Sequence, residues 1–479
     1  MGIIEDKRKK IRAGETTPRE YPKRDTFVEM SEVLNVLSRK IKKLEPKIVD
    51  ANKQANNLMS LYEFLTLEDT EAIYVYEDGV YRMRGKAVIK KWCQTELGEY
   101  LTTHKVNEII NHIRRMSFIS REELEKKNAE NSHLICVKNG ILNLNTKKIK
   151  DHNSDVVFFN KLTVKYNPEQ GFKEWEKFIM QIIQVEDLIL MQKWFGYNLL
   201  RNCSYEKACL MFGPGGNGKT RILRVMEKML GEENCSAESL QDLEYHRFAR
   251  VKIHNKLANV CADISKREMT KTSIFKKAVS GERLSGERKG ENKFEFRPYT
   301  KFSYSANEIP ETYDLTDGFM ERWILFRCPN KFRGTDEEIR DIEKKFTESE
   351  EMMSGILNWA IEGYRLLDEF RFDEQTAKEV RKIWIRNSDS VQAFIDDCLY
   401  IDQLKHWEEK NKVRKRYVEF CGDNGMSPKA NNAFFRKLRD KIQIDDFHPK
   451  DETGDKLQLQ ALVGIKFKEK IVKQEDVIY

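Results

Sequence analysis

The stretch GPGGNGKT, residues 213–220, has the residue types and spacing of a phosphate-binding loop. Glycines let backbone N–H groups approach phosphate oxygens, and the start of a following helix adds partial positive charge. Lys219 can reach the β- and γ-phosphates of a nucleotide, and the Thr220 hydroxyl can coordinate Mg²⁺. An ordinary glycine-rich turn would not need a Lys-Thr pair after its last glycine, so the loop predicts binding of ATP with Mg²⁺. The candidate nucleotide-binding residues are Gly213, Pro214, Gly215, Gly216, Asn217, Gly218, Lys219 and Thr220.

Two further polar residues end apolar runs downstream of this loop. KLANVCAD ends at Asp263, and KFSYSAN ends at Asn307. A carboxylate at the tip of a neighbouring strand can complete a magnesium-nucleotide site, so Asp263 is a candidate metal ligand beside Thr220. The Asn307 amide can position an attacking water, but the Asn-Glu-Ile-Pro sequence also suits a simple turn. A solvated aspartate and a turn asparagine are therefore the alternatives.

Basic residues provide two more candidates. Arg322 stands just before the apolar run WILFRC, where it can pair with its own acidic surface or reach the nucleotide of a neighbouring subunit. The segment SGERLSGERKGENKF, residues 280–294, carries Arg288 and Lys289 beside a glycine. These two cations are candidates for contact with a nucleic-acid backbone, and the alternative is a solvated charged loop.

The elements that must position these residues follow from the hydrophobic pattern. KACLMFG, KLANVCAD, TKFSYSAN and RWILFRC alternate with helical patterns over 207–328, which predicts an α/β fold around a largely parallel sheet. Upstream, two hairpins are expected at Asp78-Gly79 and Asn139-Gly140 among helical patterns. Downstream, helices followed by the two-stranded pattern KLQLQALVGIKF are typical of a winged helix.

Five divisions of the chain are expected from these patterns. They are a basic disordered arm over 1–25, a helical and α+β domain over 26–170, a P-loop domain over 171–335, a helical linker or lid over 336–390, and a winged-helix-like domain over 391–479. A chain of 479 residues is too long for one hydrophobic core, so several domains are expected.

Composition narrows the class of protein. Hydrophobic residues make up 40% and charged residues 34%, as in a soluble globular protein, and the net charge of +7 permits nucleic-acid binding without requiring it. Nine cysteines are scattered singly, which favours reduced thiols over a metal site. The sequence has neither a signal peptide nor a membrane-spanning run, so we expect a cytoplasmic protein without membrane contact.

The order of the motifs resembles that of the superfamily 3 DNA helicases, in particular the phage/plasmid primase-helicases that include the poxvirus-type enzymes. Members of that family are hexameric AAA+ ATPases encoded mainly by viruses, plasmids and integrated elements. Over residues 200–330, four spaced motifs agree in order. The resemblance is looser upstream, at VKNGILNLNTKKI and KWFGYNLL, and downstream, over residues 391–470.

This resemblance implies roles for single residues. Lys219 and Thr220 match the Walker A pair, and Asp263 matches the Walker B acid. Asn307 matches the sensor asparagine of motif C, and Arg322 matches the arginine finger. The resemblance thus implies a catalytic set of Lys219, Asp263, Asn307 and Arg322, with Thr220 and Asp263 as metal ligands.

The segment between the Walker B strand and the sensor matches the family's DNA-contacting hairpin, which lines a central channel. In this sequence its tip is Arg288-Lys289-Gly290. The resemblance therefore implies contact with single-stranded DNA there.

The sequence departs from the family in two respects. Many members carry two adjacent acids at the end of the Walker B strand, whereas Ala262 and Ile264 flank Asp263 here. Glu268 is one hypothesis for the carboxylate that orients water. The roughly 170 residues before the P-loop domain fit a helicase-proximal domain but leave no room for an added primase, so a separate primase is the expected partner.

The leading interpretation is an ATP-dependent DNA helicase in which six subunits enclose DNA, each ATP lying between Lys219 of one subunit and Arg322 of its neighbour. The C-terminal domain could contact origin duplex or a partner protein. One alternative is an ATP-dependent switch or loader that binds DNA without unwinding it. Another is a nucleotide-binding transcription regulator. The basic segment between Asp263 and Asn307 favours unwinding, because a plain switch would not need it.

Overall fold

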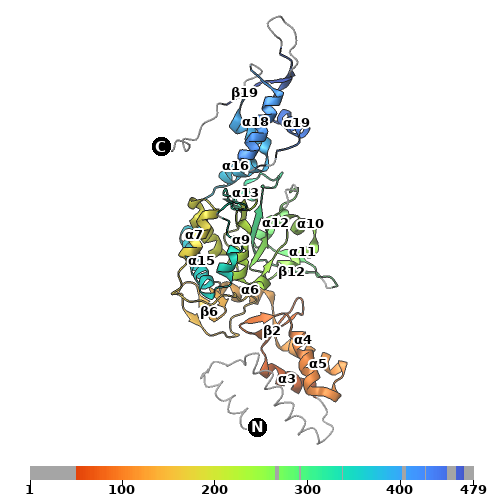
Figure 1. Ribbon diagram of the computed structural model, residues 1–479. Helices are drawn as coiled ribbons and strands as arrows, with labels where there is room; N and C mark the ends of the chain where they lie inside the picture. The colour runs from red at the N-terminus through yellow and green to blue at the C-terminus, as the bar shows by residue number, and fades with distance from the viewer. Residues whose placement is uncertain are drawn as a thin grey trace.

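The computed structural model describes residues 50–264, 269–290, 293–336, 338–401, 406–424, 426, 428–449 and 460–468. The arm predicted over residues 1–25 and the hypothesised Glu268 lie outside these described residues. The described elements form three successive groups: an N-terminal group, a central sheet covered by helices, and a C-terminal group at the far end (Figure 1).

The N-terminal group combines helices with a small sheet of strand order β3-β2-β1-β4. The hairpin predicted at Asp78-Gly79 is confirmed, since both residues have positive φ, 50° and 89°, as a tight two-residue turn requires. Buried side chains of the three larger helices and of β2 share one cluster. The elements are α3 (Ala51–Leu61), β1 (Phe64–Leu67), β2 (Ile73–Glu77), β3 (Val80–Arg82), α4 (Gly85–Leu97), the short 3-10 helix η1 (Gly98–Tyr100), α5 (Thr103–Met116), β4 (Phe118–Ile119) and α6 (Arg121–Glu130).

A second small sheet contains β5 (Leu134–Val137), β6 (Gly140–Asn143) and β7 (Ile149–Lys150). The second predicted hairpin is present, but its turn lies one residue earlier than expected, because Val137 pairs with Gly140. The Asn139 side chain is held by the backbone of Tyr166, accepting from its N–H at 2.8 Å and donating to its carbonyl at 3.0 Å. Apolar residues of β5 and β6 belong to the same core cluster as the central helices, so this sheet is packed onto the central group.

The central sheet has five strands in the order β14-β8-β13-β10-β9, and every pairing is parallel. This confirms the predicted α/β architecture with a parallel sheet. The four apolar runs named from the sequence form four of the strands, and the two-residue strand β9 was not foreseen. The strands are β8 (Ala208–Phe212), β9 (Cys235–Ser236), β10 (Ala258–Cys261), β13 (Lys301–Ala306) and β14 (Trp323–Arg327).

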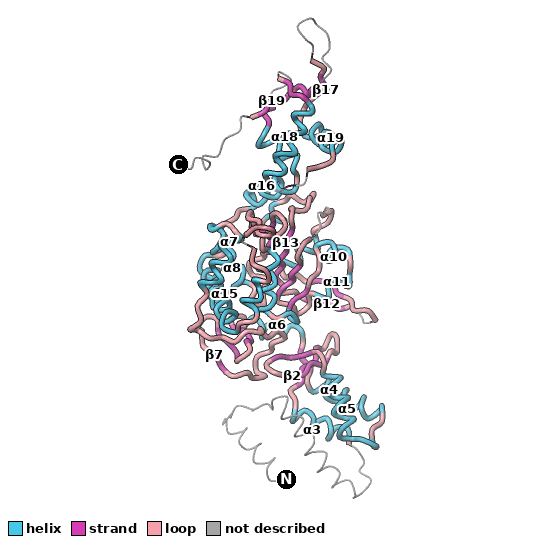
Figure 2. The backbone as a smooth tube through the Cα atoms, viewed as in Figure 1, coloured by secondary structure: helices cyan, strands magenta, loops and turns pink. Residues whose placement is uncertain are grey.

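Helices cover both faces of the central sheet. They must do so because apolar side chains of β8 point alternately to its two faces. Cys209 and Met211 point into one core, and Ala208, Leu210 and Phe212 point into the other. Residues of the first core come from α7 (Lys173–Ile182), α8 (Leu188–Tyr197), α9 (Lys219–Leu230) and α15 (Glu350–Phe370). Residues of the second come from α10 (Leu240–Tyr245), α12 (Ser273–Val279), α13 (Asp317–Met320) and α16 (Ala377–Ser388). The sheet therefore lies between two helical layers (Figure 2).

Shorter elements complete the central group. The 3-10 helices are η2 (Val185–Asp187) and η3 (Glu232–Asn234), and the remaining short helices are α11 (Arg247–Lys252) and α14 (Ile342–Thr347). A separate two-stranded hairpin, β11 (Leu284–Gly286) with β12 (Phe294–Phe296), stands outside the five-stranded sheet.

The C-terminal group has its own hydrophobic core. The two strands predicted from KLQLQALVGIKF exist but do not pair with each other: β18 pairs with β16 and β17, whereas β19 pairs with β15. Gly464, with φ of 103°, turns the chain between them. The elements are α17 (Ser390–Cys398), β15 (Leu399–Ile401), β16 (Trp407–Glu409), α18 (Lys410–Asp423), α19 (Asn431–Lys441), β17 (Asp445–Phe447), β18 (Ala461–Val463) and β19 (Ile465–Phe467).

All nine cysteines carry free thiols, and seven of them are buried. Burial raises the pKa of several of these thiols, for example that of Cys136 to about 12. Within the described ranges, none of the helices has both the length and the apolar character needed to cross a bilayer.

Candidate nucleotide site and nucleic-acid interface

The phosphate-binding loop lies between β8 and α9, the strand and helix that the sequence predicted on either side of it. Gly216 and Gly218 have φ of 81° and 89°, a region that favours glycine. A side chain at Gly218 would also place its Cβ atom 2.5 Å from Ile182 Cδ1. Both the conformation and the packing therefore require glycine in the loop, and the backbone turns as a phosphate cradle must.

Lys219 is only 6% exposed and folds back over the loop. Its ammonium donates hydrogen bonds to the carbonyls of Gly213 at 2.7 Å and Pro214 at 3.1 Å, and to Asn217 Oδ1 at 2.9 Å. Asn217 in turn donates from Nδ2 to the Cys328 carbonyl at 2.7 Å, just beyond β14. Asn217 thus fixes both the lysine and the loop against the neighbouring strand.

Strand register brings the separate motifs to one edge of the sheet. Phe212, the last residue of β8, pairs with Ala306, the last residue of β13, so the loop and Asn307 start at the same level. The next strand, β10, ends two residues before Asp263 and runs parallel to β13. Because carboxyl ends of parallel strands share an edge, Asp263 and Asn307 lie beside the phosphate loop.

Asp263 sits in a tight turn at this edge. Its φ is 60°, and its backbone N–H donates to Ser305 Oγ at 3.2 Å, while the N–H of Ile264 donates to the Ser305 carbonyl at 2.9 Å. Burial lowers the pKa of Lys219, and the charge of Asp263 is among the interactions that oppose this shift. The exposed carboxylate and the lysine are therefore electrostatic neighbours.

Asn307 lies next to the loop, since its Oδ1 atom is 3.8 Å from the position that a Cβ atom would take on Gly215. Thr220 is half-buried in the first turn of α9. The described residues contain no cluster of three or more His, Cys, Asp or Glu side chains able to hold a metal. Thr220 and Asp263 nevertheless fit Mg²⁺, which commonly uses one or two protein oxygens together with phosphate and water.

Arg322 lies at the other end of the parallel strands, where the strands begin. Its carbonyl accepts from the N–H of Ala208, the first residue of β8, at 2.7 Å. Five residues of β8, at about 3.3 Å each, separate the two edges by roughly 16 Å. Arg322 cannot span that distance, so it does not reach the phosphate loop of its own chain.

The Arg322 side chain is instead held locally. Its guanidinium donates to Ser280 Oγ at 2.8 Å and to Glu206 Oε2 at 3.2 Å, and it also contacts the Gly318 carbonyl. The Glu206 side chain is 52% exposed and the Arg322 side chain 19%, so the carboxylate end of the pair is open to solvent, which weakens the attraction. Of the two readings left open by the sequence, pairing with the chain's own acidic surface is the one present within a single chain.

The candidate DNA-contacting segment forms a hairpin, with β11 and β12 antiparallel and Arg288-Lys289 after β11. The two cations have different surroundings. Arg288 lies 5.0 Å from the centre of the Phe294 ring, and its charge lowers the pKa of Tyr74 in β2, opposing the larger effect of burial. Lys289 is exposed. Lys289 is therefore the better placed candidate for a contact with DNA, while Arg288 lies over the Phe294 ring of its own hairpin.

Replacing Lys289 with alanine should weaken DNA binding and make its salt dependence shallower by about one phosphate contact. The fold should be unaffected because the side chain is exposed. Fluorescence anisotropy with a labelled single strand at several salt concentrations measures both effects. Lys382→Ala, an exposed cation on α16, is the matched control. An unchanged salt slope for Lys289→Ala would move the DNA contact to another segment.

His254 packs beneath the hairpin, with its ring centre 5.3 Å from that of Phe294 and 4.9 Å from that of Phe296. Burial, together with the positive charges of Arg121 and Arg288, lowers the pKa of His254 to about 3. The folded protein therefore keeps this ring neutral where an unfolded chain would take up a proton.

This shift predicts that acid destabilises the protein. The stability from neutral His254 is complete above its unfolded pKa of 6.5 and is lost as the pH falls toward about 3. At about pH 5.5 the loss should be about 1 kcal/mol of unfolding free energy. Denaturant unfolding at about pH 7.5 and about pH 5.5 should show a smaller pH effect for His254→Phe than for the wild type. An equal pH effect in both proteins would show that His254 is not responsible.

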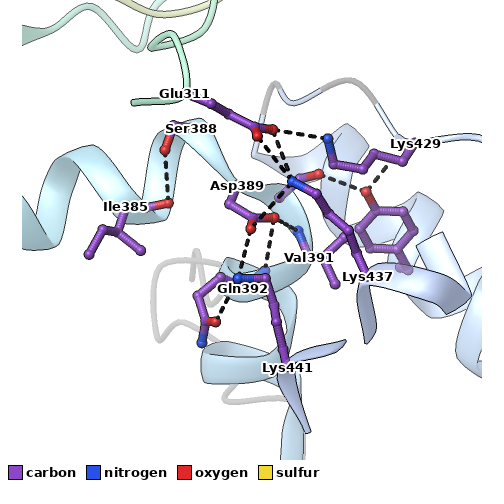
Figure 3. Close-up of polar contacts among 11 residues, drawn as sticks. Glu311, Ile385, Ser388, Asp389, Val391, Gln392, Lys429, Lys437 and Lys441 are labelled. Atoms are coloured by element: carbon purple, nitrogen blue, oxygen red, sulfur yellow. Dashed lines mark hydrogen bonds and ion pairs between the residues drawn. The ribbon is translucent and has the colours of Figure 1, made fainter. Parts of the chain in front are cut away.

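Sequence analysis missed a group of ion pairs that connects the segment after Asn307 with the C-terminal group (Figure 3). Glu311, four residues after Asn307, accepts hydrogen bonds from Lys429 Nζ at 3.2 Å and Lys437 Nζ at 3.1 Å. Burial would raise the pKa of Glu311, but these bonds outweigh it and lower that pKa. No local sequence pattern predicts these ion pairs, because each lysine is more than a hundred residues from Glu311 in the chain.

Comparison with known proteins identifies two segments of the chain. Residues 30–184 match the family described as D5 N terminal like. Residues 211–322, which include the phosphate loop and Arg322, match a family of unknown function, DUF5906. The first match confirms the predicted resemblance to the poxvirus-type proteins. No curated protein matches the sequence.

Solved structures that the chain matches include two apo structures of the NrS-1 C-terminal region. They share 12% and 13% sequence identity with this chain, each with a TM-score of 0.48. Each alignment covers 88% of this chain and 100% of the other. Similarity at this level carries no argument about function.

Proposed function

We propose that this protein is an ATP-dependent DNA helicase that acts in the replication of a virus, plasmid or integrated mobile element. The observation that supports this proposal best is the placement of Lys219, Asp263 and Asn307 around one phosphate loop, although they are far apart in the sequence. The D5-like N-terminal segment also supports it. Such a site suits phosphoryl transfer from ATP to water.

Each residue has a distinct chemical task in this proposal. The loop N–H groups and Lys219 stabilise the charge that develops on the transferring phosphoryl group. Thr220 and Asp263 hold Mg²⁺, which supplies further charge neutralisation when bound. Asn307, whose Oδ1 atom lies beside Gly215 of the loop, orients the attacking water. The chemistry depends on positioning and electrostatics, so each of these side chains must be held in place.

Assembly into a ring completes the site. Arg322 is roughly 16 Å from its own phosphate loop and weakly paired with Glu206, so it is suited to the nucleotide of a neighbouring subunit. We propose a homo-hexamer of the AAA+ class in which Arg322 leaves Glu206 for the γ-phosphate across the interface. The Lys289 hairpin would then face single-stranded DNA in the channel and move with each hydrolysis step.

We propose the following roles for the divisions predicted from the sequence. The AAA+ motor occupies 171–335 together with α15 and α16, which the sequence assigned to a lid over 336–390 but which pack on the two faces of its sheet, and the helicase-proximal domain over 26–170 precedes it. The segment 391–479 serves as a winged helix that contacts DNA or a replication partner. A separate primase supplies primers, and the protein works in the cytoplasm of a prokaryotic or virus-infected cell.

An ATP-dependent DNA-binding switch or loader is the alternative, and strand displacement separates the two. A forked duplex with a labelled strand is incubated with the protein and ATP. The helicase proposal predicts release of the labelled strand that stops when Lys219 is replaced by alanine. Binding of DNA and turnover of ATP without strand release would favour the switch or loader.

A further inference from the structure

The C-terminal group presents two helices with cationic side chains, and the structure gives them different tasks. Three lysines in and before α19 face inward: Lys429 and Lys437 bind Glu311 of the central group, and Lys441 binds Asp389 at 2.9 Å (Figure 3). These cations attach the C-terminal group to the rest of the chain. These three lysines are therefore already paired with carboxylates of the same molecule.

Helix α18 carries its cations on an outward face. Lys412, Lys415, Arg416 and Glu419 follow the spacing i, i+3, i+4 and i+7, which places them along one side of the helix. They line a groove of about 350 Å³, whose other wall is Phe467 and Lys468 at the end of β19. The groove therefore brings four cations and one carboxylate together from two elements.

Two of the four cations of this groove, Lys412 and Lys415, make few contacts within the chain. Lys412 pairs with Glu409 at 3.4 Å, but its side chain is 71% exposed, so the pair contributes little. Lys415 is exposed and forms no ion pair with the part of the chain that the structure describes. Binding an anion here would therefore disrupt few existing contacts.

An aromatic ring lies at the edge of the same groove. Lys468 donates to the Asp396 carbonyl at 2.5 Å, and its ammonium lies 5.3 Å from the centre of the Tyr400 ring. Tyr400 is 57% exposed and pairs across the strands with Lys466, which is also exposed. Cations along a surface contact the phosphates of a nucleic acid, and an exposed ring beside them can stack on a base.

We propose that the groove between α18 and β19 binds the phosphodiester backbone of DNA, and that α19 serves as the internal attachment. This inference rests on the proposed function for the choice of DNA as the ligand. The three cations of α18 lie within little more than one helical turn, and Lys468 lines the same groove from the end of β19, so the groove suits adjacent phosphates of one chain. The protein would hold DNA at the groove while the motor acts on the strand at the Lys289 hairpin.

The test uses the full chain with Lys412 and Lys415 both changed to glutamate. We measure affinity by fluorescence anisotropy for a labelled duplex of about 30 base pairs and for a single strand of the same length. Loss of two phosphate contacts should weaken binding by about tenfold or more and lower the salt slope by about two contacts. The control is Arg436→Glu, which reverses an exposed cation on α19 and should change affinity less than about twofold.

Each outcome decides the proposal. Weaker binding of the duplex, the single strand or both supports it and identifies the form of DNA that uses the groove. Unchanged affinity for both probes, or a larger loss for Arg436→Glu, would overturn it. Thermal unfolding midpoints establish that each variant is folded, and the milder Lys412→Gln, Lys415→Gln pair should shift affinity in the same direction.

This binding experiment and the strand-displacement assay together separate this inference from the proposed function. If charge reversal weakens DNA binding but the wild-type protein displaces no strand, the helicase proposal fails and the groove remains. If it displaces strands while charge reversal changes no affinity, the groove proposal fails alone.

Discussion

Replacing Lys219 with alanine is expected to abolish ATP turnover, with a loss of at least about 10²–10³-fold. The reason is that the ammonium lies within the loop, where it can neutralise charge on the transferring phosphoryl group. Removal of the buried chain costs some stability, but the contacts it makes are to the loop itself. Phosphate release under saturating ATP measures the effect.

Lys228→Ala provides the matched control for this prediction. Lys228 lies in the last turn of the same helix and pairs only with Glu232 at 3.4 Å among the described residues, so its loss should leave turnover near the wild-type value. Near-normal turnover in a folded Lys219→Ala protein would contradict the assignment of the nucleotide site.

Replacing Arg322 with alanine is expected to preserve ATP binding and reduce hydrolysis by about 10³–10⁵-fold, as for an arginine supplied across a subunit interface. Binding is retained because Arg322 lies at the edge of the sheet opposite its own loop. Nucleotide affinity is measured with a fluorescent ATP analogue, and turnover is measured by phosphate release.

Glu206→Gln distinguishes catalysis from local structure. This change removes the carboxylate that pairs with Arg322 but keeps the arginine. If the ion pair itself matters, both variants should lose activity to a similar extent. The interface role predicts that Glu206→Gln stays active, since Glu206 must release Arg322 in any case.

The parts of the site that depend on local sequence could be predicted. The phosphate loop requires glycine, lysine and threonine within eight residues, and its flanking strand and helix follow from their hydrophobic periods. Asp263 and Asn307 became candidates because each ends an apolar run, and the parallel sheet brings these strand ends to one edge, as expected.

Contacts between distant segments could not be predicted in the same way. The pairing of Arg322 with Glu206 and Ser280 depends on how β14 and α12 pack, which no pattern around Arg322 encodes. Similarly, Arg288 and Lys289 are adjacent in the sequence, but only the fold places Arg288 over the Phe294 ring and leaves Lys289 exposed. The two-residue strand β9 is too short to produce a hydrophobic period.

Complementation between two inactive variants tests most directly whether the active site lies between subunits. Lys219→Ala and Arg322→Ala proteins are mixed, mixed oligomers are verified by native mass measurement, and ATP turnover is recorded. Mixed rings contain some interfaces with an intact lysine on one side and an intact arginine on the other. Our account predicts that mixing restores part of the activity that neither protein has alone. No recovery in verified mixed oligomers would contradict it and would leave Arg322 a residue of its own subunit's surface.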